Sequence, residues 1–171
     1  MPPADRKTFI VKQVLEVLES HNLKPKRDGE EVTVAIPMRC WDPPFDLALS
    51  WSADAGAVAV IASIAGLSTG GRPNSEINEA FAAFAPSPRP LLDEMMEMQS
   101  AEGAQIVLKA ASLMGDGPRI DDDGVVRYTL IVELLAREVT RILILAMLAK
   151  AVELTRYGIW HAGLSEPTAE P

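Results

Sequence analysis

Residues Pro43–Ser52, with the sequence PPFDLALSWS, carry the clearest strand pattern in the chain. Large apolar side chains occupy every second position from Phe45 to Trp51, and small or acidic side chains stand between them. Because successive side chains of a strand point to opposite faces of its sheet, this period predicts one buried and one solvated face. The stretch Glu31–Ile36, EVTVAI, has the same period. Both stretches are therefore predicted to be half-buried strands.

Three more strands are predicted further along the chain. Residues 57–65 are apolar at consecutive positions, which is expected of a strand that is covered on both sides or lies in the middle of a sheet. Residues 104–114 and 126–133 form the fourth and fifth strands, separated by the turn-forming sequences Gly115–Pro118 and Asp121–Gly124. The links between neighbouring strands are too short for crossover helices, so the sheet is predicted to be largely antiparallel.

Helical periodicity surrounds these strands. The apolar spacing predicts helices over Asp5 to about His21, from Asn74 or Ser75 past Phe81, from Pro90 to about Ser100, and from about Ala136 to Arg156. The element order is α-β-β-β-α-α-β-β-α, which defines an α+β domain with a sheet of about five strands flanked by helices. We expect one domain over residues 1–164 and a mobile C-terminal tail over residues 165–171, which have no apolar anchor.

The charge and apolar content exclude several classes of partner. The 171 residues carry a formal net charge of -8, and nucleic-acid or anionic-membrane binding depends on clustered Lys and Arg. The most apolar stretch, Ile142–Ala149, is much shorter than the roughly 20 residues that span a bilayer. The single cysteine, Cys40, and an N-terminus without the features of a signal peptide favour a cytoplasmic location.

Candidates for catalysis and for metal or phosphate binding lack the expected partners. His21 and His161 belong to no metal-ligand pair, and Cys40 has no nucleophile motif around it. The loop Gly66–Arg72 lacks the terminal G-K-[ST] of a phosphate loop, and Asp121–Asp123 lacks the spacing of a calcium loop. The sequence therefore predicts no catalytic residue, metal or cofactor. An active site assembled from residues far apart in the sequence remains an alternative.

The last predicted helix makes a physical demand on its surroundings. Its apolar residues continue around the whole helix axis, so a single sheet face cannot bury them all. The second surface is either the pair of short helices or another copy of the chain. The contact residues predicted for a dimer or partner are Ile142, Ile144, Leu145 and Leu148, together with the adaptable side chains Met95 and Met98.

Two stretches and the element order resemble a known family. Leu92–Gln99 before the fourth predicted strand, and Asp121–Val126 before the fifth, are similar to the pattern of YbjN-domain proteins, and the order of elements resembles the type III secretion chaperone-like fold. Met96–Ser100 stands where that family usually has an Asn-rich segment. The resemblance implies an antiparallel sheet flanked by helices, small acidic homodimers, and protein binding without catalysis.

These observations predict a non-catalytic protein-binding module, chaperone- or adaptor-like, that acts as a homodimer. The alternative is a sensor domain that binds a small ligand in a pocket between the sheet and the helices. Trp41, Phe45 and Trp51 are the residues predicted to line such a pocket.

Overall fold

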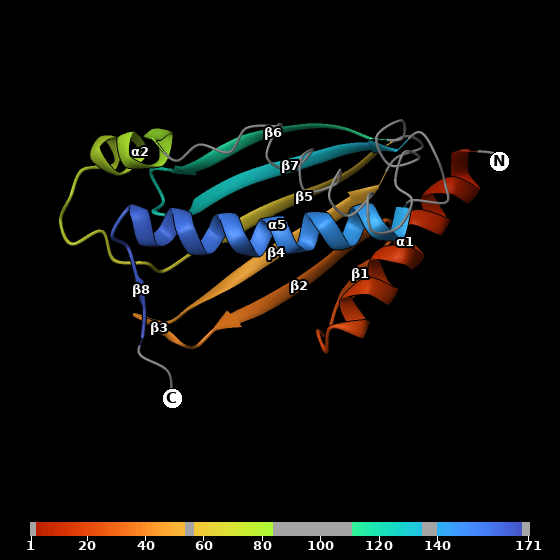
Figure 1. Ribbon diagram of the computed structural model, residues 1–171, viewed down its shortest axis with the longest axis horizontal. Helices are drawn as coiled ribbons and strands as arrows, with labels where there is room; N and C mark the ends of the chain where they lie inside the picture. The colour runs from red at the N-terminus through yellow and green to blue at the C-terminus, as the bar shows by residue number, and fades with distance from the viewer. Residues whose placement is uncertain (1–2, 54–56, 84–110, 135–139, 169–171) are drawn as a thin grey trace, which may run out of the picture.

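The computed structural model describes residues 3–53, 57–83, 111–134 and 140–168. Its main feature is a six-stranded antiparallel sheet with the strand order β1-β2-β4-β5-β7-β6 (Figure 1). The strands of this sheet are β1 (Lys26–Asp28), β2 (Glu31–Met38), β4 (Phe45–Ala53), β5 (Ala57–Ile64), β6 (Ala111–Ile120) and β7 (Val126–Leu134). A separate two-stranded sheet pairs β3 (Trp41–Asp42) with β8 (Glu166–Pro167). The predicted α+β class with an antiparallel sheet is confirmed.

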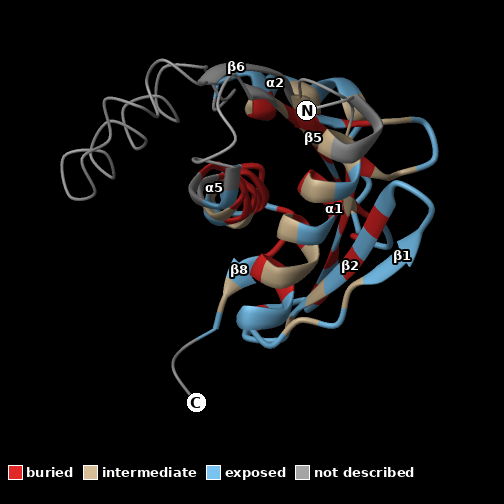
Figure 2. Cartoon of the chain, turned by 90° about the vertical axis from the view of Figure 1, so that its right-hand side faces the viewer, coloured by how far each residue is buried: buried red, intermediate tan, exposed pale blue. Residues whose placement is uncertain are grey.

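The helices that cover the sheet lie on one of its faces. Helix α1 (Pro3–Ser20) packs on β2 and β4, and helix α5 (Thr140–His161) packs on β5 and β7 and against α1. Figure 1 shows α5 crossing the sheet with α1 beside it, and Figure 2 shows both helices on the same side. Helix α2 (Asn74–Ala83) contacts mainly β6, at one side of the sheet.

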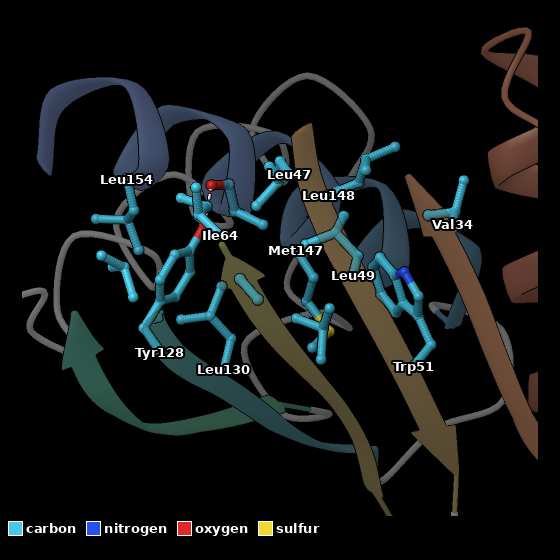
Figure 3. Packing of buried hydrophobic residues seen from close by; sticks show 14 of the residues in the cluster. Val34, Leu47, Leu49, Trp51, Ile64, Tyr128, Leu130, Met147, Leu148 and Leu154 are labelled. Atoms are coloured by element: carbon cyan, nitrogen blue, oxygen red, sulfur yellow. Dashed lines mark hydrogen bonds between the residues drawn. The ribbon is translucent and has the colours of Figure 1, made fainter. Parts of the chain in front are cut away.

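The core fills the space between this sheet face and the two helices. The inward side chains of β4 and of β5 are buried at every second position, as the period of two requires (Figure 2). They meet Met147 and Leu154 of α5 (Figure 3), and Leu143 and Ala151 of the same helix belong to this core cluster. The strand over residues 57–64 lies mid-sheet, between β4 and β7, and Ile61 on its outer side is 45% exposed. Of the two predicted environments for this strand, the mid-sheet one is correct.

Two helices end at residues with a left-handed backbone. The amide N–H of Leu23 donates to the carbonyl of Leu18, and Asn22 between the helix and this residue has φ 61°. Helix α5 ends in the same way, with Leu164 donating to Ile159 and Gly163 at φ 71°. Both are Schellman motifs, in which Asn or Gly tolerates the conformation that other residues disfavour. The last helix therefore continues beyond the predicted end at Arg156.

The fourth strand differs from the prediction. The predicted turn Gly115–Pro118 lies inside β6, and residues 104–110 lie outside the described residues. The pairing of β6 with β7 shifts register between Asp116 and Arg119. Strand β6 has no hydrogen-bonded neighbour other than β7 in the described sheet, and such edge strands tolerate Gly, Pro and bulges because only one side of the ladder must be kept. The residues Gly115–Pro118, which favour a turn, therefore form part of a bulged edge strand.

The predicted C-terminal tail is attached to the domain as far as residue 168. Trp41 pairs with Pro167, and the amide N–H of Thr168 donates to the carbonyl of Cys40 at 2.8 Å. The buried hydroxyl of Ser165 donates to the carbonyl of Pro43 at 2.6 Å. Backbone and hydroxyl groups provide the attachment that apolar side chains do not. Residues 169–171, the rest of the predicted tail, and the predicted helix at 90–100 lie outside the described residues.

Candidate functional site

The histidines and the cysteine lie on separate elements. His21 follows α1, where its Nδ1 lies 2.9 Å from the carbonyl oxygen of Val17 and 3.2 Å from the hydroxyl of Ser20. His161 is exposed in the last turn of α5, and Cys40 is exposed in the turn before β3. Within the described ranges, no group of three His, Cys, Asp or Glu side chains is placed to hold a metal ion.

The Asp-rich loop is organised by its own hydrogen bonds. The Asp121 carboxylate accepts the backbone N–H groups of Asp123 at 2.9 Å and Val125 at 3.1 Å, and it pairs with Arg127. Gly124 has φ 76°, which closes the turn between β6 and β7. These contacts satisfy Asp121 within the turn, so its role is structural.

The Gly-rich loop attaches to the C-terminal end of α5. The guanidinium of Arg72 donates from Nη1 to the carbonyl of Ala162 at 2.8 Å and from Nε to the carbonyl of Thr69 at 3.1 Å. A cation that binds the last carbonyls of a helix is stabilised by the negative end of the helix dipole. Arg72 therefore fixes the loop between β5 and α2 to the helix end.

The residues predicted to line a pocket are packed in the core instead. Trp41 and Phe45 form an edge-to-face pair with ring centroids 5.6 Å apart, and Trp51 is 1% exposed. Figure 3 shows Trp51 among Val34, Leu49 and Met147. Aromatic side chains at alternate strand positions fill the core, so their spacing alone does not distinguish a pocket lining from packing.

One gap lies between the sheet and α5, around Tyr128, Leu154 and Ile159, and it has no room for a water molecule. None of the predicted residues Trp41, Phe45 and Trp51 lines this gap. Two roomy depressions among the described residues, of about 550 and 570 Å³, lie on the opposite side of the sheet and share Ala48 and Ser63; Phe45 lines the second of them.

The residues predicted to form a dimer or partner contact on α5 are divided by the structure. Ile144 is 0% exposed and Leu148 is 5% exposed, both within the core of their own chain. Leu145 is partly buried and packs against this core. Helix α1, which lies alongside α5, supplies a second surface that the sequence argument did not consider. The side chain of Ile142, and Met95 and Met98, lie outside the described residues.

The face of the sheet opposite α1 and α5 is a surface that the sequence analysis did not single out. We call it the open face and define it by the outward side chains of β2, β4, β5 and β7. These are Glu31, Thr33, Ala35, Pro37, Asp46, Ala48, Ser50, Ser52, Ala57, Ala59, Ile61, Ser63, Arg127, Thr129 and Ile131. Strands favour β-branched and aromatic side chains, whereas Ala is depleted in them, so the run of Ala and Ser on this face is unusual. The small side chains of this face could have been found in the sequence, because they stand between the large apolar residues of the alternating strands.

Helix α5 provides a second exposed surface near its C-terminal end. Tyr157 is 51% exposed and Trp160 is 52% exposed, and a spacing of three residues places them on one side of the helix. Arg156 is exposed next to Tyr157. Trp, Tyr and Arg are the residues most enriched in the energetic centres of protein interfaces. This group was not predicted from the sequence, because the predicted helix ended at Arg156.

Comparisons with known proteins found no match for this chain. Neither a protein-family model nor a curated protein nor a solved structure matches the chain. None of the helices among the described residues is long and apolar enough to cross a membrane.

Proposed function

We propose that the chain is a non-catalytic protein-binding module, chaperone- or adaptor-like, that acts as a homodimer in the cytoplasm. The observation that carries the proposal is the group Arg156, Tyr157 and Trp160 on α5. Each of the two aromatic side chains leaves about half of its surface in water, although 32 other hydrophobic residues are buried in the part of the chain that the structure describes. Large aromatic surface beside a cation is the composition of a binding hot spot.

The chemistry of this group defines the partner segment. Apolar side chains of the partner would cover the rings of Tyr157 and Trp160, and a carboxylate would pair with the exposed guanidinium of Arg156. The open face supports the second half of the proposal, since it supplies a separate surface for dimer formation. The element order, which resembles the type III secretion chaperone-like fold, agrees with both.

Trp160 provides the test, because it is the exposed tryptophan, whereas Trp41 and Trp51 are 5% and 1% exposed. Partners captured from the protein's own cells are titrated onto the purified chain while acrylamide quenching of its fluorescence is measured. We expect a genuine partner to protect Trp160 from acrylamide. We also expect the double variant Tyr157→Ala and Arg156→Ala to weaken binding at least tenfold. A tenfold change corresponds to about 1.4 kcal/mol, and two hot-spot side chains together contribute more than this to the free energy of binding.

A matched control carries Lys12→Ala and Glu19→Ala, which remove exposed side chains from α1. This control should bind the partner as the wild type does. Equal loss of binding in both variants, or quenching of Trp160 that a bound partner leaves unchanged, would overturn the assignment of the α5 surface.

A further inference from the structure

The open face has an uncharged centre. The strand registers place Thr33, Ser50, Ile61 and Thr129 in one row across β2, β4, β5 and β7. The neighbouring rows contain Ala48 and Ser63 on one side, and Ser52 and Ala59 on the other. The centre therefore lies between Ser50 and Ile61, where Ile61 is the exposed large apolar side chain.

The charges of the open face lie around this centre in an ordered way. On the β1 side, Lys26 continues the central row next to Thr33. Strand spacing of about 4.8 Å puts it about 12 Å from the centre, measured across the strands. Asp46 lies four residues from Ser50 on β4, which is about 13 Å from the centre measured along the strands.

The second pair of charges occupies opposite corners. Glu31 lies on β2, two residues before Thr33 of the central row, and accepts a hydrogen bond from the Ser50 hydroxyl at 2.9 Å. Arg127 lies on β7, two residues before Thr129 and on the other side of the row, and it also pairs with Asp121 of its own turn. Each residue lies about 7 Å from the centre measured across the strands and about 7 Å measured along them. The two residues are displaced in opposite directions, so they occupy opposite corners. Asp28 lies opposite Glu31 in the register of β1 with β2 and adds a second carboxylate at the acidic corner. Arg119 lies opposite Arg127 in the register of β6 with β7 and adds a second guanidinium at the basic corner.

We propose that the open face binds the open face of a second copy of this chain, sheet against sheet, with the strands crossing at about a right angle. The dimer has a twofold axis that lies in the interface and runs diagonally across the sheet. This axis exchanges the direction across the strands with the direction along them. It therefore places Lys26 over Asp46 of the second copy, and Glu31 over Arg127 of the second copy, each pair twice.

Other twofold arrangements do not match these charges. An axis parallel to the strands places Glu31 over Ile131 of the second copy, and an axis across the strands places Glu31 over Ala35 and Lys26 over another Lys26. The crossed arrangement belongs to the known orthogonal class of sheet packing. Small side chains around Ile61 allow the two backbones to approach closely.

The whole sheet face, with β1 and β6 added to the four strands of the open face, is of the size that such a contact needs. A sheet of six strands with about eight residues in each long strand covers about 25 by 28 Å, or about 700 Å² per copy. Stable protein interfaces bury about 600 to 1,000 Å² per partner. The proposal rests on the homodimer of the proposed function and leaves Tyr157 and Trp160 accessible on the other side of the molecule.

A charge exchange tests the arrangement in the full chain. Among the described residues, neither the Lys26 nor the Asp46 side chain makes an ion pair or hydrogen bond within its own chain, so both can be changed without cost to the fold. We expect Lys26→Glu, and separately Asp46→Lys, to weaken the dimer about tenfold, because each change turns an attraction into a repulsion in two symmetry-related contacts. The double variant should restore the wild-type dissociation constant. Lys12→Glu on α1, with the same change of charge, is the control.

Sedimentation equilibrium over a concentration series distinguishes the outcomes. A wild type that is monomeric throughout refutes the homodimer and this contact together. A dimer that withstands Ile61→Asp and both single charge changes overturns the contact and leaves the homodimer standing. A dimer that Ile61→Asp separates, but whose single charge variants are not rescued by the double variant, overturns the crossed arrangement. Weakening by the single variants followed by rescue in the double variant supports it.

Discussion

The hydroxyl of Tyr128 connects the sheet to α5, and its removal gives a sharp test of the core. Tyr128 is 2% exposed on β7 and donates to the carbonyl oxygen of Ala151 on α5. The same hydroxyl contacts Oγ1 of Thr155, which itself donates to the Ala151 carbonyl at 2.7 Å. Figure 3 shows the Tyr128 ring pointing toward the helix. Three oxygens thus share one buried network.

We expect Tyr128→Phe to lower the free energy of unfolding by about 1 to 1.5 kcal/mol, because one buried hydrogen bond is lost and Thr155 still satisfies the Ala151 carbonyl. Thr155→Val should cost about 0.5 to 1 kcal/mol, because the Tyr128 hydroxyl keeps its acceptor. The double variant removes both hydroxyl groups and leaves no buried donor without an acceptor. Its cost should be about 1 kcal/mol, less than the sum of the single variants. Urea unfolding followed by tryptophan fluorescence measures all four proteins.

The pH dependence gives an independent measurement of the same group. Burial raises the pKa of Tyr128 well above its usual value of 10.0, and its hydrogen bond with Thr155 only partly opposes this effect. The folded chain therefore keeps a proton that the unfolded chain loses above pH 10, so this contribution to stability is complete below pH 10 and falls above it. Above pH 10 the free energy of unfolding falls through this group by at most about 1.4 kcal/mol per pH unit. The advantage of the wild type over Tyr128→Phe should shrink between pH 10 and 11. Equal stability of the two proteins at pH 7, or a difference that is constant up to pH 11, would refute this account.

Three further substitutions test other contacts of the fold by thermal or urea unfolding. Asn78→Ala should cost about 1 to 2 kcal/mol, because the Asn78 amide accepts the N–H of Ile120 at 2.8 Å and donates to its carbonyl at 3.2 Å; an unchanged melting temperature would contradict this. Gly163→Ala should cost about 1 to 2 kcal/mol because φ is 71° at this position, and a neutral result would mean that the helix end rearranges. Ile144→Glu should unfold the chain, since it buries a carboxylate, whereas Leu145→Glu at its half-buried position should leave it folded; equal effects would show that the helix is rotated.

The alternating strands were predictable because their signal is local. From Phe45 to Trp51 the period of two is complete, and the buried and exposed residues follow it in the structure. The pairing of β4 with β5 and of β6 with β7 was also predictable, since short connections favour antiparallel neighbours, whereas the pairing of β5 with β7 across a long connection was not. The position of β6 was not, because Gly115–Pro118 has turn chemistry and only its place at the sheet edge makes it compatible with a strand.

The surfaces were harder to predict than the fold, because they depend on contacts between distant residues. The apolar circumference of the last helix indicated that a second surface was needed, but not that α1 supplies one. Ile144 and Leu148 therefore lie inside the chain, where an interface was predicted. The spacing that made Trp41, Phe45 and Trp51 candidate pocket residues is also the spacing of core residues. The positions of charged residues such as Glu31 and Arg127 at opposite corners of the open face could not be predicted, because they depend on the strand registers.

The pairing of β5 with β7 has a consequence for how this chain folds and varies. Val60 pairs with Leu130, about 70 residues later, whereas β1, β2, β4 and β5 follow one another as near neighbours, as do β6 and β7. Two locally formed meanders must therefore meet along one central seam, and closing the loop between them is the slow step expected of such a topology. Once that seam is formed, doubling the length of the connection would cost only about 0.6 kcal/mol. A longer connection between β5 and β6 would therefore cost the fold little, provided that α2 and the Arg72 anchor within it are kept.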